Sequence, residues 1–209
     1  VEVLYFNPIF VSPSNHKYDI QDYDYIDPHY GVIVEDGGNI LAEGDHENAN
    51  ATKYQKRVTD KKNLEASNEF FVQFVEEVHR RGMKVILDGV FNHCGSFNKW
   101  LDRERIYEKQ EGYAPGAYVS ADSPYRSYFR FFQEERERWP YNGSYDGWWG
   151  HDTLPKLNYE GSRELIFLRL RRNGCHRRTM RMAGVWMWQR ILEEVTSTIT
   201  NSGKSSVKL

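Results

Sequence analysis

The sequence lacks the features that mark several classes of protein. Its 209 residues include two cysteines, Cys94 and Cys175, too few for a disulfide framework and compatible with a reducing compartment. It has no apolar run of about 18 residues, so no transmembrane helix is expected. Its net charge of -2 gives no basic surface of the kind that binds nucleic acid. We therefore expect neither a membrane nor a nucleic acid as partner. We place the protein in the cytoplasm, with secretion as the alternative.

The chain also lacks an initiator methionine and a signal peptide. Val1 opens directly into the strand-like segment 1–6, and a domain rarely begins inside a core strand. We therefore expect the natural protein to start upstream. A length of 209 residues suits one domain, at roughly 150 residues for each domain.

Aromatic residues, by contrast, are abundant. They make up 15% of the chain, with 14 Tyr and 6 Trp. Sugar-binding clefts use such rings because their apolar faces stack on the C–H faces of pyranoses. An aromatic-rich core is the alternative explanation.

The most informative stretch is the hexapeptide Asp88-Gly-Val-Phe-Asn-His93. It follows the apolar segment 83–87, which is typical of a buried strand. In a parallel α/β barrel, active sites are built where strands end. A buried acid is costly without a partner, so Asp88 requires a cation or a hydrogen-bond donor from elsewhere. The alternative, of equal weight on the hexapeptide alone, is a turn with a space-filling histidine.

The order of the other elements predicts a parallel crossover unit. Residues 1–11 favour a buried strand, and 14–50 a polar loop. Residues 67–81 favour an amphipathic helix capped by Ser67, and Gly82 follows its last turn. With a strand at 83–91, strand–helix–strand indicates parallel strands. The irregular stretch 94–158 is too long for a loop and predicts an inserted subdomain. The predicted apolar stripe of the helix comprises Phe70, Phe71, Phe74, Val75 and Val78.

Four motifs follow one another along the chain: Asn7-Pro8-Ile9-Phe10 with Ser12-Pro13, His16-Lys17-Tyr18-Asp19 with Asp22-Tyr23, Asp88 to His93, and Leu154-Pro155-Lys156-Leu157-Asn158. In this order they resemble the α-amylase superfamily of glycoside hydrolases, and most closely its neopullulanase, cyclomaltodextrinase and maltogenic amylase branch. Leu154 replaces the Met of the branch's Met-Pro-Lys-Leu-Asn motif. The resemblance covers about the first 165 residues, and one match alone would be weak.

The resemblance implies a partial (β/α)8 TIM barrel, α/β in class, with about strands 2–3 and a small subdomain inserted after strand 3. Residues 1–93 would belong to the catalytic barrel and 94–158 to the subdomain. Residues 159–170 would start the next barrel helix. The tail from 171 to 209 is expected to be frameshifted or disordered.

The resemblance also implies roles for single residues. Tyr18 would stack on the glucose unit whose bond is cleaved, and His93 would bond its primary hydroxyl. Asp88 would hold the arginine that flanks the nucleophile. Asn92 matches a position that ligates calcium in some relatives, so Ca²⁺ stays open and no other cofactor is expected. The remaining residues assigned to the substrate cleft are Trp148, Trp149, Asn158 and, beside them, His151.

The catalytic acids of this family cannot be identified in the chain. A retaining glycosidase needs a nucleophile and a general acid/base, and the family's Gly-x-Arg-x-Asp strand does not appear after Asn158. Residues from Asn173 onward can be back-translated into several DNA sequences. For one permitted choice of codons, the same bases read one position earlier encode KWVSPPYNADGWRLDVAADLG and then RGNEYNHQFWKEFRK. This frame contains Gly-Trp-Arg-Leu-Asp. We therefore predict a one-base frameshift between about Leu165 and Asn173, with a diverged natural C-terminus as the minor alternative. The residues with single codons fit without adjustment: Met180, Met182, Trp186, Met187 and Trp188.

These features predict a parent enzyme that hydrolyses α-1,4 and perhaps α-1,6 glucosidic bonds of maltooligosaccharides, cyclodextrins or pullulan with retention. Its partners would be α-glucan oligosaccharides, and a homodimer is the expected assembly. The chain itself is expected to be inactive and prone to aggregation, because a partial barrel leaves strand edges and apolar surface uncovered. A non-catalytic glucan-binding protein and a transglycosylase of the same superfamily are the alternatives.

Overall fold

The computed structural model describes residues 1–132 and 145–172, and the tail and Cys175 lie outside this range. Across these residues, no helix is both long and apolar enough to cross a membrane. The strands are β1 (Val3–Phe6), β2 (Phe10–Val11), β3 (Asp22–Ile26) and β4 (Lys84–Leu87). The α-helices are α1 (Thr52–Thr59), α2 (Lys61–Arg80) and α3 (Tyr159–Arg172), and the 3-10 helices are η1 (Asn48–Asn50), η2 (Arg126–Tyr128) and η3 (Trp148–Gly150).

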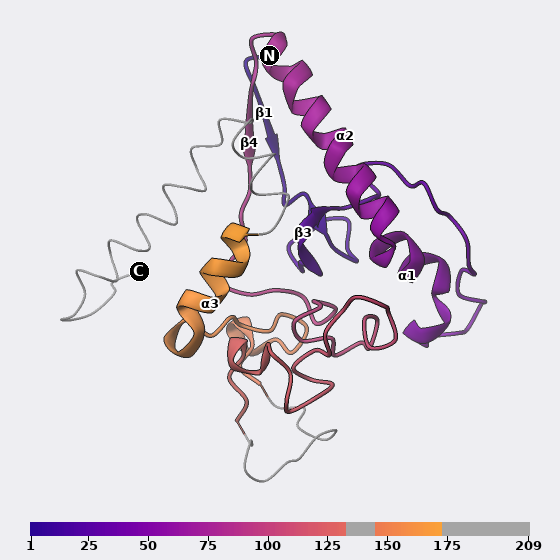
Figure 1. Ribbon diagram of the computed structural model, residues 1–209, viewed down its shortest axis with the longest axis vertical. Helices are drawn as coiled ribbons and strands as arrows, with labels where there is room; N and C mark the ends of the chain where they lie inside the picture. Colours follow the sequence, from indigo (N-terminus) through magenta and orange to yellow (C-terminus); the bar gives the residue numbers. More distant parts are fainter. Residues whose placement is uncertain (133–144, 173–209) are drawn as a thin grey trace, which may run out of the picture.

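The predicted parallel crossover is confirmed. Strands β1 and β4 pair in parallel, with Val3 opposite Lys84 and Phe6 opposite Leu87. Helix α2 is the last element of the connection between them and runs beside the pair (Figure 1). The Phe6 ring packs edge-on against Phe71 of α2, with ring centroids 6.3 Å apart. Asp88 therefore follows the carboxyl end of a parallel strand.

Helix α2 is longer than predicted. It begins at Lys61, where Asp60 caps it by accepting a hydrogen bond from the Lys62 N–H at 2.9 Å. The predicted cap, Ser67, is wrong: it lies buried within the helix. Phe70 is 42% exposed and is not part of the buried stripe. Gly82 has φ 74°, a left-handed conformation that suits a glycine after a helix.

Ser67 instead joins the helix to the preceding loop. Its hydroxyl donates to the Val32 carbonyl at 3.0 Å and accepts from the Val32 N–H at 3.1 Å. A Cβ at Gly31 would lie 2.5 Å from the Ser67 Cβ, so only glycine fits this contact. The region predicted as a polar loop also contains β3, which pairs antiparallel with β2.

The core continues from the helix–strand unit into the segment after β4. Tyr23 of β3 stacks on Trp100, with ring centroids 5.2 Å apart. Between β4 and α3, the described residues contain two 3-10 helices and no α-helix. Aromatic rings thus tie this irregular segment to the strands, and the largest buried side chains include Trp100, Tyr23, Tyr107, Phe10 and Phe129.

Candidate functional site

Tyr18 and Asp88 lie together although 70 residues separate them in the sequence. The Tyr18 hydroxyl donates to Asp88 Oδ2 at 2.6 Å. This bond raises the pKa of Tyr18 to about 12. Asp88, which the sequence left without a partner, thus has a hydrogen-bond donor. Its pairing with an arginine stays a prediction.

Tyr5 is a third member of this group that the sequence analysis missed. A hydrogen bond to Asp88 raises the pKa of Tyr5 as well. Tyr5 lies opposite Ile86 in the β1–β4 pair, one residue before the end of β1. The predicted parallel pairing of the two strands was the signal that could have indicated this proximity. Two phenols therefore meet one carboxylate at the ends of the strands.

His93 is buried and presents one nitrogen without an ordinary hydrogen bond. The Asn92 amide nitrogen donates to His93 Nδ1 at 2.7 Å, which puts the proton of a neutral imidazole on Nε2. Burial lowers the pKa of His93, and the nearby backbone of Tyr18 offsets this only in part. Within the described residues, Nε2 makes no hydrogen bond of normal geometry. Nε2 is thus a buried donor without an acceptor of normal geometry among these residues.

The fourth sequence motif lies directly beside this histidine. His93 and Lys156 form an antiparallel bridge. On either side of it, the Cys94 N–H donates to the Pro155 carbonyl and the Leu157 N–H to the Asn92 carbonyl, both at 3.0 Å. The structure thus joins two motifs that are some sixty positions apart in the chain.

Three aromatic rings extend outward from the buried imidazole. His93 stacks on Trp148 with ring centroids 4.8 Å apart, and Trp148 stacks on Trp149 at 4.3 Å. Trp149 is 82% exposed and has φ 52°, a left-handed conformation unusual for a large side chain. The exposed His151 closes this turn through its N–H, which donates to the Trp148 carbonyl at 3.1 Å. The ring series offers one apolar face to solvent.

Asn158 has a structural role in the chain as it stands. Its Oδ1 accepts from the Gly161 N–H at 3.3 Å, so Asn158 caps the first turn of α3. Its amide nitrogen donates to the Ser127 carbonyl at 3.2 Å. The preference of asparagine for this position was a signal in the sequence. Substrate binding by Asn158 stays a prediction.

The described residues around Asn92 gather no group of acidic side chains for a calcium ion. Asn92 is exposed and uses its amide nitrogen on His93. Within 1–132 and 145–172, no three His, Cys, Asp or Glu side chains gather to hold a metal ion. Calcium prefers six to eight oxygen ligands, so we derive no role for it here.

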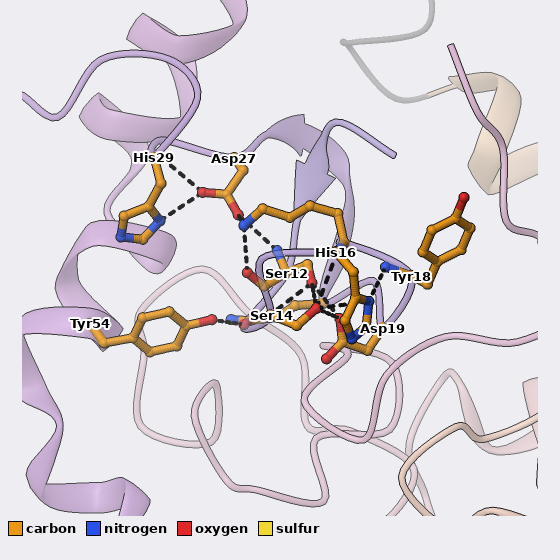
Figure 2. Close-up of polar contacts among 10 residues, drawn as sticks. Ser12, Ser14, His16, Tyr18, Asp19, Asp27, His29 and Tyr54 are labelled. Atoms are coloured by element: carbon orange, nitrogen blue, oxygen red, sulfur yellow. Dashed lines mark hydrogen bonds and ion pairs between the residues drawn. The ribbon is translucent and has the colours of Figure 1, made fainter. Parts of the chain in front are cut away.

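The loop that carries Tyr18 holds a serine, a histidine and an aspartate, but they do not form a catalytic relay (Figure 2). Ser14 Oγ lies 3.2 Å from His16 Nδ1 and donates to Asp19 Oδ1. A relay needs the imidazole between the hydroxyl and the carboxylate, whereas here the hydroxyl lies in the middle. The cluster therefore shapes the loop.

Asp27 anchors the same loop, and its lowered pKa predicts that the free energy of unfolding depends on pH in the acid range. Burial alone raises its pKa, but hydrogen bonds from His29 and Lys17 outweigh burial and lower it below the ordinary 3.8. The folded chain thus binds fewer protons than the unfolded chain near this pH. We expect the stabilisation from Asp27 to be complete above pH 3.8 and to be lost as the pH falls further.

Urea unfolding at a series of pH values from about 6 to 2 measures this effect. In the Asp27→Asn variant, the free energy of unfolding should fall less steeply on the acid side. Equal slopes in the two proteins would show that Asp27 is not the group responsible. Acids that do not contact Asp27 titrate in both proteins alike, so the difference isolates Asp27 and the groups bonded to it.

Comparison with known proteins identifies the class to which this site belongs. The family model described as the catalytic domain of alpha amylase matches residues 1–47 and 65–192. The chain therefore belongs to the α-amylase family of glycoside hydrolases. This confirms the resemblance drawn from the four motifs and makes the protein an enzyme by family.

Individual relatives agree with this family. The chain is 31% identical over 163 residues to an amylopullulanase of Thermoanaerobacter thermohydrosulfuricus, covering 75% of this chain and 8% of the relative. It is 30% identical over 207 residues to a maltogenic alpha-amylase of Bacillus licheniformis, covering 97% and 26% respectively. The type III pullulan hydrolase from Thermococcus kodakarensis matches in structure with a TM-score of 0.51 and 27% identity, covering 88% of this chain and 23% of that one. The chain thus spans a small part of each relative.

Proposed function

We propose that this chain forms one wall of the glucan-binding cleft of an enzyme that hydrolyses α-1,4 and α-1,6 glucosidic bonds of maltooligosaccharides, cyclodextrins or pullulan with retention. The observation that carries the proposal is the bond between Tyr18 and Asp88 beside the end of β4, with the Tyr18 backbone near His93 and a tryptophan stacked on that imidazole. The relatives support the substrate class, because they are named for pullulan and maltose chemistry.

The chemistry of these groups suits a sugar. A hydroxyl-rich ring needs directional hydrogen bonds, and the Nε2–H of His93, which has no acceptor of normal geometry among the described residues, supplies a donor. Its pyranose C–H faces need apolar surface, and Trp148 and Trp149 supply it. Cleavage needs two further acids, and none is assigned within the described residues. We therefore expect the 209-residue chain to bind a glucan without cleaving it.

Calorimetric titration with maltotetraose tests the binding. We expect His93→Ala and Trp149→Ala each to weaken binding by about tenfold, the effect of losing one hydrogen bond or one stacking contact of about 1.4 kcal/mol. Phe132→Ala is the matched control, because Phe132 is also an exposed aromatic residue, 59% exposed, and no site role is assigned to it.

Equal affinities in all four proteins would contradict the proposal. Hydrolysis of maltotetraose by the unchanged chain would contradict its catalytic part. Binding by the chain together with an inactive complete protein would favour the alternative of a non-catalytic glucan-binding protein of the same fold.

A further inference from the structure

We propose that Lys17 is a positioning residue for Tyr18: its left-handed backbone and its buried ion pair with Asp27 hold the Tyr18 hydroxyl against Asp88. The proposal rests on the function proposed above, since Tyr18 matters for binding only if the sugar enters this site. It adds two residues that the four motifs do not assign to the cleft.

The backbone of Lys17 is the first observation. Its φ is 67°, in the left-handed region that favours glycine. A residue with a side chain persists there only when the surrounding structure holds it. Lys17 is only 5% exposed, and a lysine is rarely buried without a partner. Both features therefore require a cause nearby.

The Asp27 carboxylate supplies that cause. Lys17 Nζ donates to Asp27 Oδ2 at 2.6 Å and to the Ser12 carbonyl at 3.0 Å. The same Oδ2 accepts the Ser12 N–H at 3.0 Å. Asp27 is itself held by its own N–H, which donates to the Ile9 carbonyl at 2.9 Å. One carboxylate thus fixes the start of the loop and the lysine in its middle.

The position of Lys17 sets the direction of the next side chain, that of Tyr18. With the Lys17 side chain directed inward to Asp27, the Tyr18 ring points away from that carboxylate (Figure 2). The Tyr18 N–H donates to His16 Nδ1 at 3.1 Å, and the Tyr18 hydroxyl reaches Asp88. Release of Lys17 removes the constraint that sets this direction, so the Tyr18–Asp88 bond should be lost.

A second buried ion pair offers a matched control. Lys99 Nζ lies 2.6 Å from Asp22 Oδ1, the same distance as in the Lys17–Asp27 pair, and Lys99 is 8% exposed. Its side chain contacts β3 and not the loop that carries Tyr18. A purely stabilising role for Lys17 would make the two pairs equivalent in their effect on Tyr18.

The experiment follows the Tyr18 ring in the full 209-residue chain labelled with ¹³C at tyrosine Cζ. Tyr18→Phe assigns the resonance. In Lys17→Met, we expect the resonance to move to the position of a phenol without a carboxylate partner, and the maltotetraose affinity to fall about tenfold. Should Lys17→Met fail to fold, Lys17→Met/Asp27→Asn leaves no unpaired charge and carries the same expectation. The control Lys99→Met/Asp22→Asn/Asp24→Asn removes Lys99 together with both of its carboxylate partners and should change neither reading.

An unmoved Tyr18 resonance in the folded Lys17 variants would overturn the proposal. Equal movement in the Lys99 control would also overturn it, because the effect would then be general loosening. If the unchanged chain binds no maltotetraose while the resonance moves only in the Lys17 variants, the proposed function fails and the positioning role stands.

Discussion

Insertion of one base between the codons for residues 165 and 173 is expected to raise hydrolysis of maltotetraose by about 10⁶-fold or more, the lower range of enzymic rate enhancement, when the restored frame is expressed together with the strands that supply the general acid/base. The frame one base earlier then follows α3 and encodes Gly-Trp-Arg-Leu-Asp. This supplies the arginine expected beside Asp88 and a nucleophilic aspartate, two roles that no described residue is assigned. A retaining glycosidase cannot form its covalent intermediate without the nucleophile.

The DNA sequence of this region is the first measurement, and expression of the gene with the added base is the second. Insertion of three bases at the same place is the matched control, because it adds a residue and keeps the frame. An uninterrupted frame on repeated sequencing, without gain of activity on insertion, would sink the hypothesis. The family match runs on to residue 192, so the frameshift stays a prediction until the DNA is read.

Replacement of Lys99 by Met is expected to lower the free energy of unfolding by about 3–5 kcal/mol, the usual cost of removing one partner of a buried ion pair. Lys99 Nζ bonds both Asp22 and Asp24. Burial alone lowers the pKa of Lys99, but the two carboxylates outweigh burial and raise it. Asp22 is fully buried, and burial raises its pKa, so its charge depends on the lysine.

Urea unfolding at pH 7 measures this loss. Lys62→Met is the matched control: Lys62 Nζ lies 2.8 Å from Glu35 Oε1, but its side chain is 70% exposed. Such a surface pair contributes about 0–1 kcal/mol. Equal losses in the two variants would show that burial of the Lys99 pair has no special weight.

The sequence was sufficient where local pattern and long-range packing agree. The alternation of strand, amphipathic helix and strand predicted the parallel β1–β4 pair, and Gly82 has the left-handed backbone expected after a helix. It failed where the partner of a side chain lies far away in the chain. Ser67 has the chemistry of a helix cap, but its bonds go to Val32, 35 residues away. Strand β3 was not predicted because its aspartates are typical of a loop, and Lys99, the ion-pair partner that allows their burial, comes much later in the chain.

The candidate site likewise contains residues that the sequence predicted and residues that it did not. The four motifs predicted that Tyr18, Asp88 and His93 share one site, and the structure brings Tyr18 to Asp88. Their spacing did not reveal Tyr5, which reaches Asp88 through strand pairing, or the Lys17–Asp27 pair. Asp27 lies outside every motif residue quoted, and its contact with Lys17 depends on the path of the loop between them.

The pairing of His93 with Lys156 sets an order of assembly during synthesis. The β1–β4 pair needs only the first 87 residues, so it can form while the later residues are still being made. The contacts of residues 155–157 with residues 92–94 can form only after the chain has been extended past residue 157, since the Leu157 N–H donates to the Asn92 carbonyl. Closing so long a loop costs chain entropy before any contact repays it. The His93 imidazole therefore lacks the neighbours that bury it until Trp148 and the segment 155–157 have been made, and we expect solvent to reach it during that interval.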